Sequence, residues 1–125
     1  MNKAPVQPWA VGITGFLLVA AAAGYLISPG QMLSVVGISA SAESAFLVQT
    51  LAAAFIAMVP MAWSVRRRTP GPVAAAVLRG LAVYMFAGSA VDLYAYSNGL
   101  VGFPALPSIG ARTALGLVLA WLALP

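Results

Sequence analysis

The sequence of 125 residues has very little charge, with two acidic and six basic residues, or 6% of the chain. A soluble domain carries about 25% charged residues, whereas 62% of this chain is hydrophobic. So few charged side chains cannot cover the surface of a folded domain in water. The composition therefore excludes an ordinary soluble domain and indicates a protein that lies in a lipid bilayer.

Cysteine and histidine are both absent. Their absence excludes disulfides, thiol redox chemistry, histidine-ligated haem and the usual zinc sites. It also excludes the quinone-linked membrane enzymes that form disulfides, because those enzymes need cysteine pairs. We therefore predict neither a metal nor a cofactor.

The net charge of +4 does not indicate a nucleic-acid partner, because three of the six basic residues form one cluster, Arg66, Arg67 and Arg68. A cluster of this kind between apolar segments orients a membrane protein. Membrane lipids, and no nucleic acid, are the predicted surroundings.

The sequence has instead four long apolar stretches, at 9–28, 45–65, 73–96 and 106–124. About 20 such residues span a bilayer as a helix. The stretches are continuous, whereas strands of a membrane β-barrel alternate apolar and polar residues over about 10 positions. We predict an all-α integral membrane protein, a single four-helix antiparallel bundle covering residues 1–125.

Helix-breaking and helix-capping residues separate the stretches. Ser28, Pro29 and Gly30 end the first helix, Ser41 begins the second with Glu43 in its first turn, and residues 97–99 end the third. Segment 31–44 is moderately apolar and is predicted to form a short re-entrant or interfacial piece. Pro60 should kink the second helix, and residues 66–72 should form a tight hairpin.

The basic residues predict the orientation in a cell membrane of the bacterial inner-membrane type. Arg66, Arg67, Arg68 and Lys3 should remain cytoplasmic, so that both termini face the cytoplasm. The first stretch is also compatible with a cleaved signal peptide, but it is longer than the usual apolar core of about 7–15 residues. We favour a retained helix.

Asp92 and Arg112 are the charged residues predicted to lie inside the bundle. They reach similar depth on the third and fourth helices, which are antiparallel, so we predict an ion pair between them. Its plainest role is to fix the two helices against each other. The alternative is that the pair forms part of a ligand site.

Helical spacing adds polar residues to this candidate site. Leu81, Met85, Gly88, Ser89, Asp92 and Tyr96 share one face of the third helix, and Tyr96 is placed to hydrogen-bond to the carboxylate. Glu43 and Gln49 enter the same half from the second helix, although Glu43 also fits a solvated helix cap. The predicted result is an outward-facing pocket beneath loops 31–44 and 100–107. Arg79, on another face, should extend towards lipid headgroups, or alternatively contact an anionic ligand.

The layout resembles that of the DoxX-like group of small four-helix membrane proteins. The resemblance consists of a glycine-rich first helix ending in residues 28–33, Val36-Gly37-Ile38, an arginine cluster after the second helix, Arg79, and Asp92 before Asn98-Gly99. Members often carry an arginine near the start of the second helix, where this chain has Glu43. The resemblance implies the four-helix fold and no particular activity.

Three classes of function remain open at this stage. The first is a binding or accessory protein whose pocket takes a lipophilic small molecule or a helix of a partner membrane protein. The second is a transporter or channel that works as a homo-oligomer, with Asp92 or Glu43 facing a water-filled path. The third is a membrane enzyme that acts on a lipophilic substrate with Asp92 as its catalytic acid or base.

Overall fold

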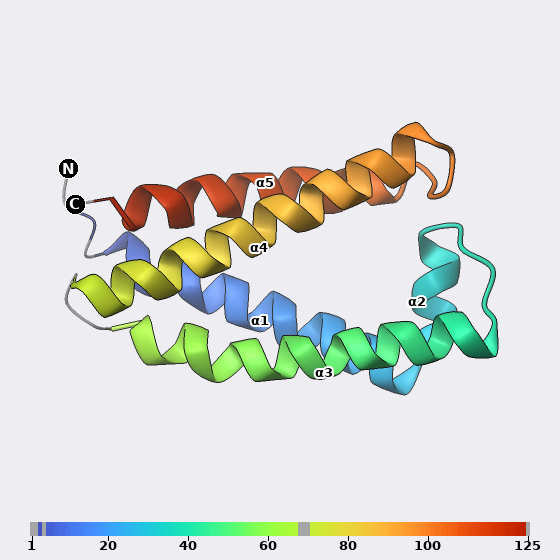
Figure 1. The fold of residues 1–125 in the computed structure, drawn as a ribbon, viewed down its shortest axis with the longest axis horizontal. Helices are drawn as coiled ribbons and strands as arrows, with labels where there is room; N and C mark the ends of the chain where they lie inside the picture. Colours follow the sequence, from blue (N-terminus) through green and yellow to red (C-terminus); the bar gives the residue numbers. More distant parts are fainter. Residues whose placement is uncertain (1–2, 4, 68–70, 125) are drawn as a thin grey trace.

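The computed structural model describes residues 3, 5–67 and 71–124, and all regular structure in these ranges is helical (Figure 1). Four helices are long and apolar enough to cross a membrane. They are antiparallel neighbours, which confirms the predicted fold class. In chain order the helices are α1 (Val6–Ile27), the short α2 (Pro29–Val35), α3 (Ala42–Val65), α4 (Pro72–Ser97) and α5 (Ala105–Leu122).

The predicted helix boundaries have identifiable physical causes. Ser41 caps α3, because its hydroxyl accepts from the Ser44 backbone N–H at 3.1 Å while the Ser44 hydroxyl accepts from the Ser41 N–H at 2.9 Å. Pro72 occupies the first turn of α4, where its missing N–H has no intrahelical partner to lose. Within the predicted hairpin after α3, Arg68, Thr69 and Pro70 lie outside the described residues.

Two glycines with positive φ end α2 and α4. Gly37 has φ +85° and Gly99 has φ +69°, values that L side chains rarely adopt. The Ile38 N–H then donates to the Leu33 carbonyl at 3.0 Å, and the Leu100 N–H donates to the Ala95 carbonyl at 2.9 Å. Both turns therefore satisfy carbonyl groups that the helix ends leave without an intrahelical donor.

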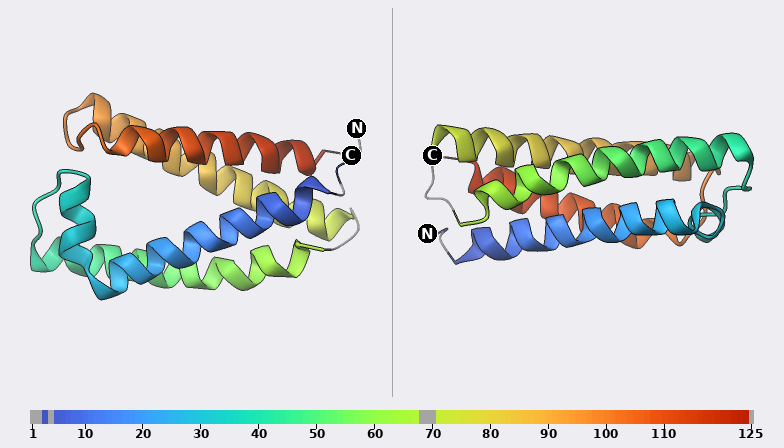
Figure 2. Two further views of the ribbon diagram at one scale, coloured as in Figure 1. Left: turned by 180° about the vertical axis from the view of Figure 1, so that it is seen from behind. Right: turned by 90° about the horizontal axis from the view of Figure 1, so that it is seen from below.

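The long helices form two pairs, each made of helices joined in sequence. α1 packs along α3, and α4 packs along α5 (Figures 1 and 2). The pairs approach each other where α1 begins and α5 ends, and they diverge towards the end that carries α2. The molecule is therefore narrow at the end near the termini and wider at the opposite end.

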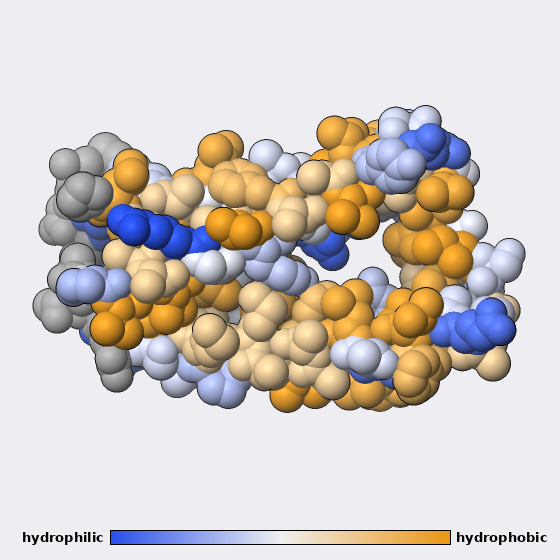
Figure 3. Space-filling model, in the orientation of Figure 1, coloured by the Kyte–Doolittle hydropathy of each residue, from blue (hydrophilic) through white to orange (hydrophobic). Residues whose placement is uncertain are grey.

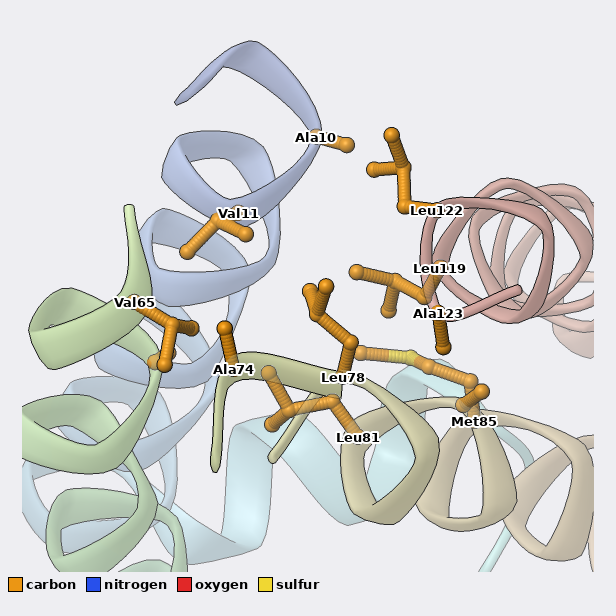
Figure 4. Packing of buried hydrophobic residues seen from close by; sticks show 12 residues of the cluster. Ala10, Val11, Val65, Ala74, Leu78, Leu81, Met85, Leu119, Leu122 and Ala123 are labelled. Atoms are coloured by element: carbon orange, nitrogen blue, oxygen red, sulfur yellow. The ribbon is translucent and has the colours of Figure 1, made fainter. Parts of the chain in front are cut away.

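A core of small and branched side chains joins the two pairs at the narrow end (Figure 4). Val11 of α1, Val65 of α3, Leu78 of α4 and Leu119 of α5 are each at most 2% exposed. Burying one such side chain contributes about 1.5–3 kcal/mol in water, and in lipid close packing supplies the attraction. This packing joins the two pairs at the narrow end.

Polar side chains tie helix ends together at the same end. The Gln7 side-chain amide donates to the Val65 carbonyl at 2.7 Å, and the Arg66 Nε donates to the Pro8 carbonyl at 3.2 Å. The Lys3 ammonium donates to the Leu124 carbonyl at 2.8 Å. Arg66 at the C-terminal end of α3 and Lys3 beside the C-terminal end of α5 are cations at positions that the helix dipole favours.

The outward faces of the long helices are strongly apolar. Phe16 is 71% exposed, Phe46 67% and Val83 66%. Exposed apolar surface of this extent is unfavourable in water and rare on soluble proteins. These side chains are in contact with lipid when the helices span a bilayer.

Candidate functional site

The predicted ion pair is present at the divergent side of the bundle. Arg112 Nη1 of α5 lies 2.8 Å from Asp92 Oδ2 of α4, and the two side chains are 27% and 31% exposed. The pair joins the two helices of one antiparallel pair, as the matching depth of the charges predicted. A charge-assisted hydrogen bond at this distance is among the stronger polar contacts in proteins.

Gly88 and Ser89 adjoin the pair in different ways. A Cβ atom on Gly88 would lie 3.0 Å from Arg112 Nη1, so the absent side chain makes room for the guanidinium. The Ser89 hydroxyl is 3.4 Å from the Ile109 carbonyl oxygen, to which it donates. The glycine therefore makes room beside the arginine, and the serine links α4 to α5.

The structure does not bring the remaining predicted residues to the pair. Tyr96 is 36% exposed, and no hydrogen bond recorded among the described residues joins it to Asp92. Glu43 and Gln49 occupy exposed positions on α3, in the other helix pair. Glu43 lies in the first turn of α3, where its charge is favoured by the helix dipole. Glu43 and Gln49 are separated from the ion pair because the helix pairs diverge at this end, whereas Tyr96 lies one turn after Asp92 on α4 without a hydrogen bond to it among the described residues.

A cavity of about 500 Å³ lies between the two helix pairs. Figure 3 shows the surface hollowed between the α4–α5 pair and the α1–α3 pair. All five helices contribute to the walls, which are mostly apolar. The lining residues are Leu17, Leu18, Ala20, Ala21, Met32, Phe55, Tyr84, Met85, Pro107, Ser108, Ala111 and Arg112.

The cavity is bounded along the bundle axis on both sides. The apolar core closes the narrow end, where Met85 belongs both to that core and to the cavity wall. At the opposite end the Gly102 N–H donates to the Val36 carbonyl at 3.0 Å, which connects the loop after α4 with the segment after α2. The hollow between the pairs is therefore open to the side, at the depth of the apolar helix surfaces.

Aromatic side chains in the cavity wall were not recognised from the sequence. Phe55 packs edge-on against Tyr84 with ring centroids 5.8 Å apart, and both residues line the cavity. Tyr84 precedes Gly88 by four residues and Asp92 by eight, so helical spacing alone places it on the same face. Phe55 carried no comparable signal, because α3 is apolar nearly all round.

Arg79 lies outside this cavity. It is exposed, and its Nη2 atom is 3.4 Å from the carbonyl oxygen of Ala123, close to the end of α5. It also lines a second hollow of about 320 Å³ at the narrow end, together with Gln7 and Gly71. The residue thus contacts the Ala123 carbonyl at the end of α5, a position favourable for a cation.

The side chains around the cavity are suited to binding more than to proton transfer. Arg112 is the charged residue among the described lining residues, and its partner Asp92 is not in the wall. Among the described residues no group of three or more acidic, histidine or cysteine side chains is placed to hold a metal ion. The cavity is therefore an apolar binding pocket with hydrogen-bond donors from Arg112, Tyr84 and Ser108.

Comparison of the chain with protein-family models, with curated proteins and with solved structures gives no match. The fold and the exposed apolar helix faces define the class: this is a small multi-pass membrane protein in contact with lipids.

Proposed function

We propose that the protein binds a lipophilic small molecule in the cavity between its two helix pairs. The observation that carries this proposal is the cavity itself, which measures about 500 Å³ and has apolar walls with a single charged lining residue among those described, Arg112. Ligand pockets usually have volumes of about 300–1,000 Å³ and few, well-placed polar groups.

The sideways opening favours a ligand that arrives through the membrane. The ends of the cavity are bounded by the core and by the contact between Gly102 and Val36, whereas its side opens among apolar helix faces. A lipophile dissolved in the bilayer needs no aqueous passage to enter such a site. The resemblance to the DoxX-like group is compatible with this proposal and adds no activity to it.

Transport and catalysis have less support from the geometry. Both predicted mechanisms need a carboxylate that faces the substrate, but Asp92 is engaged by Arg112 and Glu43 lies at an exposed position on α3. A helix of a partner protein, or a second copy of the chain, is a less suitable occupant because the lining side chains converge on a closed-ended hollow. We propose further that both termini face the cytoplasm, since Lys3, Arg66 and Arg79 all lie at the narrow end.

Ligand-dependent stability tests this proposal. Thermal unfolding of the wild-type protein in lipid nanodiscs is measured with and without each of a panel of lipophiles. Two variants are measured in the same way. Ala111→Phe fills the cavity, and Ala53→Phe is the control that adds the same ring on an exposed face of α3. A ligand present at about 100 times its Kd should stabilise wild type and Ala53→Phe by about 2.7 kcal/mol, and Ala111→Phe should not respond. Equal responses of all three proteins would show that the lipophiles act through the bilayer and not through the cavity.

A further inference from the structure

The charge of the cavity wall restricts the kind of ligand that it can hold. Arg112 contributes one positive charge, and Asp92, which is not in the wall but whose Oδ2 lies 2.8 Å from Arg112 Nη1, contributes one negative charge. The other polar side chains of the described wall, Tyr84 and Ser108, are uncharged at neutral pH. The cavity wall, which includes Arg112, and Asp92 therefore carry no net charge when they are counted together.

Neutrality matters because the site lies at the depth of the apolar helix surfaces. An anionic ligand would leave the wall and Asp92 with a net negative charge, and a cationic ligand would leave them positive. An uncompensated charge within a membrane is costly. An uncharged ligand preserves the balance.

The wall also has more hydrogen-bond donors than acceptors. A guanidinium group has five N–H donors and no acceptor, and the recorded partner of Arg112 among the described residues is one carboxylate oxygen of Asp92. The hydroxyls of Tyr84 and Ser108 can add further donors. A ligand that supplies an acceptor oxygen, such as an ester, ketone or ether, satisfies donors that an alkane leaves unsatisfied.

We infer that the cavity selects uncharged lipophiles whose polar end carries an acceptor oxygen, with Arg112 as the donor and Asp92 as the residue that sets the charge preference. This inference rests on the proposed function, because it names the ligand class of the same cavity. Asp92 acts through Arg112 and is a positioning and specificity-determining residue.

Three probes of equal chain length but different charge test the inference: methyl laurate, laurate under alkaline conditions where it is ionised, and dodecyltrimethylammonium. Binding to protein in nanodiscs of zwitterionic lipid is measured by calorimetry, and the signal of Ala111→Phe is subtracted as the partition background. Wild type should bind methyl laurate about tenfold or more tightly than either ion, the effect of a charge penalty of about 1.4 kcal/mol. Asp92→Asn, which leaves Arg112 uncompensated, should reverse the order and bind laurate more tightly than the ester.

Arg112→Gln provides the opposite change and a second route if Asp92→Asn does not fold. It leaves the Asp92 charge uncompensated, so it should bind the ammonium probe more tightly than wild type does. Charge preferences that stay the same in the variants as in wild type would overturn the inference while leaving cavity binding intact. Binding of no probe above the Ala111→Phe background would overturn the inference together with the proposed function.

Discussion

At the scale of single residues, the position of Arg112 depends on the absence of a side chain at Gly88. A Cβ on Gly88 would meet Arg112 Nη1 at 3.0 Å, closer than most such contacts in proteins. The guanidinium occupies that space and faces the Asp92 carboxylate at 2.8 Å. Glycine in the middle of α4 weakens the helix, so its presence there is explained by the room that the arginine needs.

Gly88→Ala should therefore displace the guanidinium by a few tenths of an ångström and weaken the ion pair. Gly80→Ala in the same helix is the matched control, because its new Cβ meets no described atom within 4 Å. The control should gain up to about 1 kcal/mol from better helix propensity. Gly88→Ala should be at least about 1 kcal/mol less stable than the control in reversible unfolding in mixed micelles, and an equal gain in both variants would contradict the steric argument.

The ion pair itself can be measured by a double-mutant cycle. Asp92→Asn and Arg112→Ala should each lower the free energy of unfolding by about 2 kcal/mol, because each leaves a partly buried charge without its partner. The double variant should lose clearly less than the sum of the two, since neither charge remains. Strictly additive losses would show that the two charges do not stabilise each other.

At the scale of helices, the sequence predicted the elements well and their mutual arrangement only in part. Composition and length predicted four spans, and residues such as Ser41 and Gly99 indicated where helices begin and end. The neighbouring α4 and α5 followed from matching charges. The divergence of the two pairs was not predictable, because helices that are apolar all round carry no polar face to show which side packs against protein and which against lipid.

The connection at the α2 end gives an element-scale prediction. Gly37 and Gly99 both have positive φ, so alanine at either position should lower stability by about 1 kcal/mol. Only at Gly37 would the new Cβ also approach the backbone nitrogen of Gly102, at 3.4 Å, whereas at Gly99 it would meet no described atom within 4 Å. Gly37→Ala should therefore be the more destabilised variant and should also exchange its Gly102 amide hydrogen faster than Gly99→Ala does.

At the scale of the whole molecule, the sequence predicted where the candidate site lies but not the cavity that forms it. Asp92 and Arg112 were recognisable because charge is so rare in this chain. The cavity next to them is formed by apolar segments of all five helices, and ordinary residues such as Leu17 or Ala111 give no sign of that role. Glu43 and Gln49 were assigned to the pocket on depth alone, which says nothing about the divergence that separates them from it.

The proposed orientation is testable because the chain has no cysteine, so that one introduced thiol reports one position. Asn98→Cys lies at the divergent end and Ser64→Cys at the narrow end, and both positions are exposed. A membrane-impermeant maleimide added to intact cells should modify Asn98→Cys and leave Ser64→Cys unmodified until the membrane is permeabilised. The reverse pattern would place the termini outside the cytoplasm.

The pairing of helices in chain order has a consequence for how the molecule is made. Residues 6–65 contain both members of the first pair, and residues 72–122 contain both members of the second. Proteins fold from the N-terminus during synthesis, so the ribosome can deliver each hairpin to the membrane as a separate unit. The core at the narrow end, and with it the cavity, comes into existence only when the second hairpin meets the first. A bound lipophile would therefore act on assembly at its last step, by holding two finished halves together.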